Sequence, residues 1–300
     1  MTRLQSDDIS GISSQLKAYD EELLVKTGYN LRQIGCHAVG LGEEDAREVI
    51  SRIRVGVVPI RWGQGVIEGF CNATADILKH LGFETFVARH PDISGFAEAY
   101  EAKADVVFSS DDHDFVALNA VTRQYVHNAV ATGRGFAAGL DLMARGLADR
   151  EVLVLGCGAV GRNSTLALLN YGAKVSIYDI NPRISQDLLK ALSGTDADRI
   201  TIEVDFHKAL SEHSLVVDAT NASEIIQARD ISAQAFIAAP GMPLGLSRDA
   251  RIKISDRLLH DPLQIGVATM GMGVVKQLIE NETASFAAVS NGKKKANIEY

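Results

Sequence analysis

The chain has 300 residues, of which 46% are apolar and 23% are charged, and its formal net charge is −8. This length suits two domains, and the composition is that of a globular protein and excludes global disorder. The negative net charge argues against nucleic acid and anionic membrane surfaces as partners.

The three cysteines, Cys36, Cys71 and Cys157, stand far apart and show no spacing typical of a disulfide scaffold or a zinc site. The histidines are scattered as well, so we predict no metal site. The first residues lack the apolar segment of a signal peptide, and no apolar run reaches the roughly 20 residues that cross a bilayer. We therefore expect a cytoplasmic protein with reduced thiols.

The first part of the chain predicts helices and then an alternation of strands and helices. Apolar residues at three- and four-residue steps predict an amphipathic helix over 6–26, and glycines interrupt helical fragments in 27–54. Strands are expected at 55–60, 83–88 and 104–108, with helices at 66–81 and about 94–103. This alternation predicts a parallel sheet with right-handed crossovers.

A second series of the same kind follows a helix predicted at 133–148. Its strands are expected at 151–155, 174–178, about 200–204, 214–218, 235–238 and 257–260, and its helices at 159–171, 183–193 and 264–280. The predicted fold class is α/β, with a short parallel sheet in an N-terminal substrate domain and a C-terminal Rossmann domain. We place these domains at 1–132 and 133–283, with a flexible tail over 284–300.

A glycine-rich turn marks the start of the second series. The strand 152–155 leads into Gly156-Cys157-Gly158-Ala159-Val160-Gly161, a helix follows, and the next strand ends at Asp179. The three glycines permit a tight turn, close approach of a pyrophosphate and close packing of helix on strand. An acid in the place of Asp179 accepts hydrogen bonds from ribose hydroxyls and repels a 2′-phosphate, so the predicted cofactor is NAD.

Other residues are expected to border the cofactor because ligands of open α/β sheets bind at the carboxyl ends of strands. Ordinary loop capping is the alternative at each position. These further cofactor-binding candidates are Ile180, Arg183, Ala219, Thr220, Pro240 and Gly241.

An acidic cluster follows the strand at 104–110 and includes Asp111, Asp112 and His113. A carboxylate there can hold a cation or accept a proton, although a solvated turn has the same composition. The sequence leaves open which of the two aspartates would accept a proton from a substrate. The nearby Asn119, His127 and Asn128 are candidates for hydrogen bonds to a polar substrate, so the expected partner is a small molecule.

Two other strand ends carry candidate substrate-binding residues. Arg61 and Trp62 follow the first strand, where Trp62 either forms a pocket wall or packs at the domain interface. Asp261 follows the last strand and either reaches the cleft or caps the next helix.

Several segments together resemble the PylD family of pyrrolysine biosynthesis dehydrogenases. The resemblance runs from near Leu4 to about residue 275. It is carried by 57–60, 63–67, 91–95, Asp111-Asp112 with Phe115, the region of Asn128, and 266–270. The segment Pro91-Asp92-Ile93-Ser94-Gly95 is distinctive, whereas the glycine fingerprint is generic to NAD enzymes.

The resemblance implies a two-domain enzyme that binds its substrate between the domains. It implies NAD-dependent oxidation of the terminal primary amine of 3-methyl-D-ornithyl-N6-L-lysine, with loss of ammonia and closure of a pyrroline ring to give pyrrolysine. It assigns Asp111 or Asp112, with Asn128, to the amino groups as catalytic residues and Leu4 to the pocket entrance.

Arg61 and Trp62 stand where the family is expected to have small hydroxyl residues. A divergent NAD-dependent amine or amino-acid dehydrogenase with another substrate is therefore the alternative, and a non-catalytic NAD sensor is a third reading. The sequence leaves monomer and homodimer both open.

Overall fold

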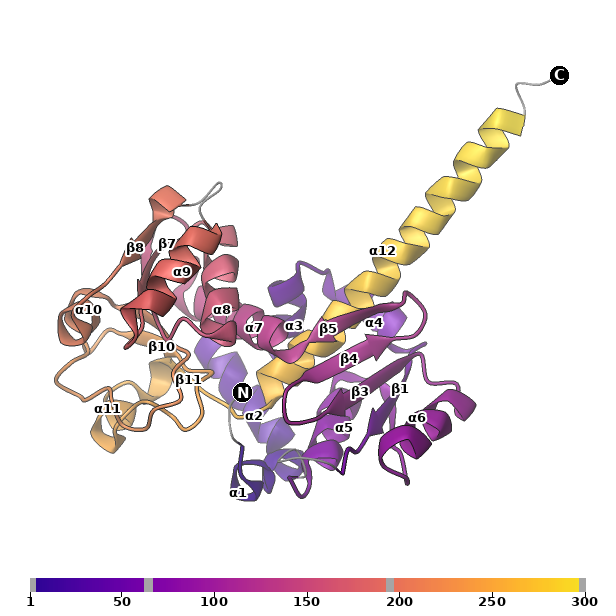
Figure 1. The fold of residues 1–300 in the computed structure, drawn as a ribbon, viewed down its shortest axis with the longest axis horizontal. Helices are drawn as coiled ribbons and strands as arrows, with labels where there is room; N and C mark the ends of the chain where they lie inside the picture. The colour runs from indigo at the N-terminus through magenta and orange to yellow at the C-terminus, as the bar shows by residue number, and fades with distance from the viewer. Residues whose placement is uncertain (1–3, 62–66, 193–196, 297–300) are drawn as a thin grey trace.

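The computed structural model describes residues 4–61, 67–192 and 197–296, which build two sheets and the helices around them (Figure 1). The helices are α1 (Ser6–Ile9), α2 (Ile12–Thr27), α3 (Leu31–Val39), α4 (Glu43–Ile50), α5 (Phe70–Leu81), α6 (Asp92–Glu101), α7 (Asn128–Ala144), α8 (Ala159–Asn170), α9 (Pro182–Leu192), α10 (Phe206–Glu212), α11 (Arg248–Lys253) and α12 (Gln264–Ala296). The strands are β1 (Arg54–Val58), β2 (Glu84–Val87), β3 (Val106–Ser110), β4 (Phe115–Asn119), β5 (Gln124–His127), β6 (Glu151–Leu155), β7 (Lys174–Tyr178), β8 (Ile200–Ile202), β9 (Leu215–Asp218), β10 (Phe236–Ala238) and β11 (Leu258–Leu259).

The first sheet has the order β2-β1-β3-β4-β5. Its first three strands are parallel, as predicted, but β4 and β5 add an antiparallel hairpin that the sequence reading left unassigned. The period of two is present in β4, where Phe115 and Ala117 are buried and Leu118 is exposed. The strands are only five and four residues long, which is why the pattern is weak.

The second sheet is parallel throughout and has the order β11-β10-β9-β6-β7-β8. Numbered within the domain, this is the Rossmann order, in which the chain changes direction between the first and fourth strands. All six strands were predicted to within two residues, and the α/β fold class is confirmed. The carboxyl ends of β6 and β9 lie side by side at this switch point.

Helix α7 packs between the two sheets, and α12 packs against α7 and runs along the first sheet (Figure 1). After the last strand of the second sheet, α12 returns to contact α3, α5, β4 and β5 of the first unit. Both units share one continuous hydrophobic core. The domain boundary near residue 132 remains a prediction, because α7 and α12 connect the two units through their contacts.

The helix predicted over 6–26 is divided into α1 and α2, and the one predicted over 66–81 begins at Phe70. Helices α7 and α12 are longer than predicted. Helix α7 begins at Asn128, because the side chain of His127 accepts the amide hydrogen bond that starts it. Helix α12 continues to Ala296, so the backbone after residue 284 is helical where a frayed tail was expected (Figure 1). The segment 281–296 contains no proline and one glycine, and its alanines favour a helix.

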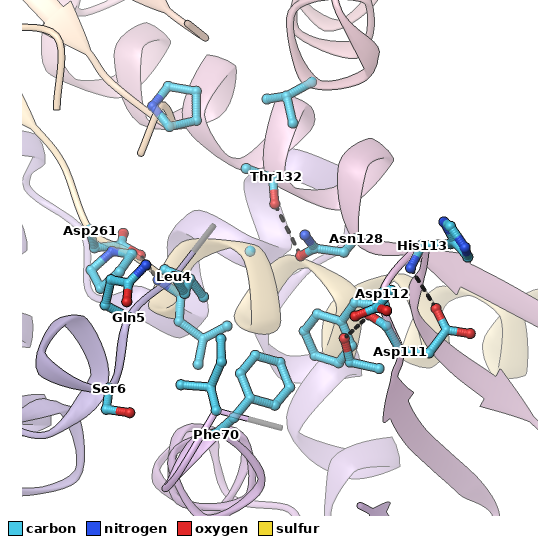
Figure 2. A pocket seen from close by; sticks show the side chains of 18 of the residues that line it. Leu4, Gln5, Ser6, Phe70, Asp111, Asp112, His113, Asn128, Thr132 and Asp261 are labelled. Carbon is cyan, nitrogen blue, oxygen red and sulfur yellow. Dashed lines mark hydrogen bonds between the residues drawn. The ribbon is translucent and has the colours of Figure 1, made fainter. Parts of the chain in front are cut away.

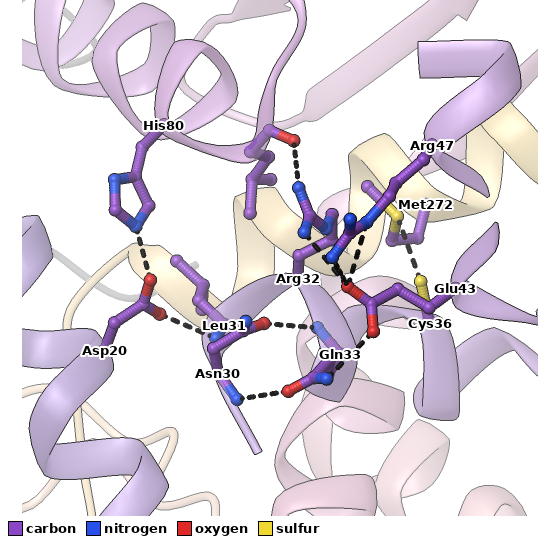
Figure 3. Close-up of polar contacts among 11 residues, drawn as sticks. Asp20, Asn30, Leu31, Arg32, Gln33, Cys36, Glu43, Arg47, His80 and Met272 are labelled. Carbon is purple, nitrogen blue, oxygen red and sulfur yellow. Dashed lines mark hydrogen bonds and ion pairs between the residues drawn. The ribbon is translucent and has the colours of Figure 1, made fainter. Parts of the chain in front are cut away.

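The segment 27–54 forms α3 and α4, which a polar network fixes to their neighbours (Figure 3). Asp20 of α2 accepts the Leu31 amide at 2.7 Å and contacts the ring nitrogen Nε2 of His80, on α5, at 2.6 Å. Gly40 ends α3 with a left-handed φ of 69°. These contacts explain why helical fragments that read as interrupted in sequence are ordered in the fold.

Glu43 joins α3 to α4 in the same network (Figure 3). Its carboxylate accepts hydrogen bonds from Arg32 at 3.0 Å, Gln33 at 2.8 Å and Arg47 at 2.7 Å. These donors, Arg47 first, lower the pKa of Glu43 from its ordinary 4.5 to about 2.

Among the helices that the structure describes, none is long and apolar enough to span a bilayer.

Candidate active site

The glycine turn between β6 and α8 has the geometry that its sequence predicts. Gly156 has a φ of 83°, a conformation that side chains disfavour. A Cβ added to Gly161 would overlap the carbonyl oxygen of Gly156, whereas a Cβ on Gly158 would meet nothing within 4 Å. Gly161 therefore allows the close packing of α8 on the turn, and Gly158 leaves open space where a pyrophosphate can approach.

The beginning of α8 fits an anionic group. Gly158 is the N-cap residue and supplies no side-chain acceptor for the first amides of the helix. Such amides and the helix dipole favour phosphate. Asp179, at the end of β7, accepts the Cys157 amide at 2.8 Å and the Asn181 amide at 2.9 Å, so the acid predicted to meet the ribose is fixed beside the glycine turn.

The other predicted cofactor residues fall into two groups around this turn. Ile180 is 90% exposed and Arg183 is exposed on α9, so both lie on the open side of Asp179. Thr220 and Gly241 approach so closely that a Cβ on Gly241 would overlap the Thr220 carbonyl oxygen. The loops after β9 and β10 are thus packed together next to β6.

Cys157 and Ala219 occupy the inner side of the turn. The Cys157 side chain is buried, with its sulfur 3.6 Å from the Ser185 hydroxyl, and burial raises the pKa of its thiol to about 11. The methyl group of Ala219 packs near Gly161. Cys157 therefore contributes its backbone amide to Asp179, while its thiol is protonated at neutral pH.

A cavity of about 670 Å³ opens between the glycine turn and the first sheet (Figure 2). It is lined by Leu4, Gln5, Ser6, Ile67, Phe70, Ser110, Asp111, Asp112, His113, Phe115, Asn128, Thr132, Phe136, Val160, Pro240, Asp261, Pro262, Leu263 and Gly266. Val160 and Pro240 belong to the predicted cofactor site, and the acidic cluster lies on the first sheet. The cavity thus joins the two predicted halves of an active site.

Asp111 builds the turn that carries the acidic cluster. Its Oδ1 accepts the amides of His113 at 2.7 Å and Asp114 at 2.8 Å, and its own amide donates to the Asp114 carbonyl oxygen at 2.9 Å. The amides of Asp114 and His113 lower the pKa of Asp111. Asp111 is therefore an ionised structural acceptor within the cluster.

Asp112 and Asn128 present polar groups to the same side of the cavity (Figure 2). Within the described part of the chain, the Asp112 carboxylate has no hydrogen-bond partner, so its oxygens are free for a ligand. Asn128, the first residue of α7, accepts the Thr132 hydroxyl at 3.1 Å. This bond occupies the amide oxygen of Asn128 and leaves its NH₂ group as a donor.

Asp261 lies on the opposite side of the cavity from Asp112 (Figure 2). It both lines the cavity and holds the start of α12, since it accepts the amides of Leu263 at 3.0 Å and Ile265 at 3.2 Å. The Tyr19 hydroxyl donates to its other oxygen at 2.6 Å. Burial raises the pKa of Asp261, and these donors oppose that shift.

The remaining predicted substrate residues are placed differently. Leu4 lines the cavity beside the N-terminal helix α1. Arg61 does not line it: its side chain is 71% exposed and its Nε lies 3.4 Å from the Asp92 carboxylate. Trp62 lies outside the described residues. Asn119 is buried and bonds to Gln277 of α12 at 3.2 Å, away from the cavity.

Tyr19, which bonds to Asp261, and Thr132, which lines the cavity, were not among the predicted site residues. In the sequence, Tyr19 is one of the apolar positions that predict the amphipathic helix over 6–26. Thr132 follows Asn128 by four residues, which places both on one face of a helix. That spacing is present in the sequence, but the predicted helix began at 133 and so included neither residue.

Comparison with known proteins agrees with this geometry. Residues 143–239 match the family model described as putative NAD(P)-binding. The quinate dehydrogenase of Corynebacterium glutamicum in complex with NAD has a TM-score of 0.51 and 14% identity, over 74% of this chain and 93% of that one. This likeness concerns the fold alone. Together with the site, these findings define an NAD-dependent oxidoreductase with a Rossmann domain.

Further comparisons concern the similarity of this chain to the PylD family. Residues 8–126 match the model of the N-terminal domain of the pyrrolysine biosynthesis protein PylD. Proteins named pyrrolysine synthase from Methanosarcina acetivorans and Methanosarcina barkeri are 28% and 29% identical over 272 residues, or 90% of this chain and 98% and 97% of the relatives. The predicted resemblance to PylD is confirmed by these matches.

Proposed function

We propose that this chain uses NAD to oxidise the terminal primary amine of 3-methyl-D-ornithyl-N6-L-lysine, and that ammonia is lost as a pyrroline ring closes to give pyrrolysine. The names of the two relatives support this proposal for the product. The cavity supports it for the chemical class of the substrate.

The negatively charged side chains that line the cavity are the main support for this proposal. Asp111, Asp112 and Asp261 line it, and no lysine or arginine does so among the described residues. Such a lining favours substrates with ammonium groups and disfavours those whose reacting part bears a carboxylate. An amine dehydrogenase fits this charge pattern.

Asp112 is the group that we assign to the proton of the reacting amine. A primary ammonium has no lone pair, so it loses a proton before hydride leaves its carbon. Asp111 is a poor acceptor, because two backbone amides stabilise its charge and lower its pKa. The carboxylate of Asp112 holds the ammonium and accepts its proton, and the NH₂ group of Asn128 orients a neighbouring polar atom of the substrate.

When bound, NAD supplies the acceptor for the hydride on the amine-bearing carbon. The residues that would hold it are the 156–161 turn, Asp179, and the loops around Thr220 and Gly241. Loss of one proton and one hydride converts the primary ammonium to an iminium. The ornithyl α-amine then adds to that carbon, and ammonia leaves as the cyclic imine forms.

Leu4 and Arg61 are proposed to contact the substrate at the edges of the site. Leu4 is proposed to close the entrance, which its place in the cavity lining supports. Arg61 and Trp62 are proposed to act on the distal, lysine part of the substrate. The pairing of Arg61 with Asp92 places its charge outside the amine-binding cavity.

Purified protein, NAD and synthetic 3-methyl-D-ornithyl-N6-L-lysine test the proposal, with NADH absorbance and product mass as readouts. We expect NADH formation and a product lighter by one ammonia and two hydrogens. Shikimate and quinate serve as anionic comparison substrates and are expected to give no turnover. Turnover of these acids without turnover of the amine would overturn the proposal.

A further inference from the structure

The side chain of His127 connects the two elements that carry the proposed catalytic residues. His127 ends β5 and is the N-cap residue of α7, whose first residue is Asn128. Its ring nitrogen Nδ1 accepts the Ala129 amide at 3.0 Å, and its Nε2 lies 2.7 Å from Oδ1 of Asp114. His127 itself does not line the cavity.

These two contacts define the tautomer of the ring. A nitrogen that accepts a backbone N–H carries no hydrogen, so the proton of the neutral imidazole is on Nε2. Nε2–H therefore donates to the Asp114 carboxylate. In this form, both ring nitrogens of His127 are used at once, one on each element.

Asp114 is hydrogen-bonded both to His127 and to Asp111 of the acidic turn. Its amide donates to the Asp111 carboxylate at 2.8 Å, and its carbonyl oxygen accepts the Asp111 amide at 2.9 Å. The antiparallel register, in which Val116 lies opposite His127, brings the end of β5 next to this turn. A continuous hydrogen-bonded chain thus runs from the first turn of α7 through His127 and Asp114 to Asp111, beside Asp112.

We propose that His127 is a positioning residue, which keeps Asn128 and the Asp111–Asp112 turn in register through Asp114. This inference rests on the proposed function, because it assumes that Asn128 and Asp112 contact the substrate amine. The helix cap and the hydrogen bond to Asp114 are separate roles of one ring. The cap supports stability, whereas the bond to Asp114 sets the spacing between the two catalytic elements.

Substitutions can separate these roles. In His127→Asn, the side-chain oxygen takes the place of Nδ1 and keeps the cap, but the shorter side chain does not reach Asp114. Asp114→Ala removes the same bond from the other end. We expect both variants to fold with nearly unchanged melting temperatures, and kcat to fall about 10- to 100-fold, as misplacement of a catalytic group by about 1 Å does.

The experiment compares kcat, KM and NADH affinity for the parent, His127→Asn, Asp114→Ala and the double variant, with His90→Asn as control. His90 also contacts a carboxylate, Glu98, at 3.2 Å, but it is exposed and outside the cavity. Unchanged NADH affinity and a double variant no slower than either single variant would support the proposal. Full kcat in His127→Asn, or multiplicative losses in the double variant, would overturn it. A parent without turnover would instead refute the proposed function.

Discussion

Asp111 and Asp112 are adjacent in sequence but are held in different ways. Asp111 receives two backbone amides and its pKa is lowered, whereas Asp112 keeps its carboxylate free within the described residues. The sequence alone left the proton acceptor open between them. The difference in hydrogen bonding assigns Asp111 to the turn and leads us to propose Asp112 for the proton.

Replacement of Asp112 by asparagine tests this assignment. Asn lacks the charge and the basicity of the carboxylate, so we expect kcat to fall by about 10²- to 10⁴-fold. NADH affinity, measured by fluorescence titration, should stay unchanged, because Asp112 lies on the first sheet. Asp256→Asn, at an exposed ion pair with Arg257, is the control. A rate within twofold of the parent would exclude Asp112 as the proton acceptor.

At the scale of elements, the glycine turn offers a matched pair of substitutions. Gly161→Ala forces α8 away from the Gly156 carbonyl group and should lower both stability and NADH affinity. Gly158→Ala meets open space in the protein and should leave the melting temperature nearly unchanged while weakening NADH binding. Calorimetric unfolding and fluorescence titration measure the two effects. Equal NADH affinity in Gly158→Ala and the parent would contradict the proposed pyrophosphate position.

The network of Glu43 makes the packing of α3 on α4 sensitive to pH. The folded pKa of about 2 lies below the ordinary 4.5, so the stabilisation is present above pH 4.5 and is lost between 4.5 and 2. Because the carboxylate is partly exposed, we expect Glu43→Gln to lower the free energy of unfolding by only about 1 kcal/mol at pH 7. Urea unfolding should show a smaller difference at pH 3, and an undiminished one would contradict this account.

At the scale of the whole molecule, Tyr19 and Asp261 join the N-terminal helices to the start of α12. The Asp261 carboxylate is buried, so loss of the Tyr19 donor leaves its charge less well satisfied. We expect Tyr19→Phe to lower the free energy of unfolding by about 1.5 to 3 kcal/mol, measured in urea. Tyr100→Phe, at a side chain that is 86% exposed, should have no effect. Equal losses in both variants would argue against a special role for this bond.

The sequence predicted those parts of the fold that depend on local pattern. The buried strands of the second sheet are largely apolar runs that alternate with helical segments, and the glycine fingerprint predicted the cofactor domain. The hairpin of β4 and β5 was not predicted because its strands are short and are stabilised by packing against other elements. These elements are α7, which follows β5 directly, and α12, which is distant in sequence. Asp261 and Tyr19 are 242 residues apart, so no local signal predicts their bond.

Most of the predicted substrate-site residues lie around one cavity, and their catalytic and binding roles remain predictions. Asp111, Asp112, Asn128, Leu4 and Asp261 all line the cavity, although four separate parts of the chain supply them. Arg61 was expected there as well, but the exposed pair with Asp92 keeps it out. Strand-end residues are predictable because parallel strands share an edge, whereas the direction of a loop side chain depends on partners elsewhere.

The central claim is that hydride leaves the terminal amine-bearing carbon of the substrate. Synthetic 3-methyl-D-ornithyl-N6-L-lysine with two deuterium atoms on that carbon tests it directly, with mass spectrometry of both cofactor and product. The account predicts one deuterium in the reduced cofactor and one in the pyrroline ring. Reduced cofactor without deuterium, together with a product that retains both atoms, would contradict it.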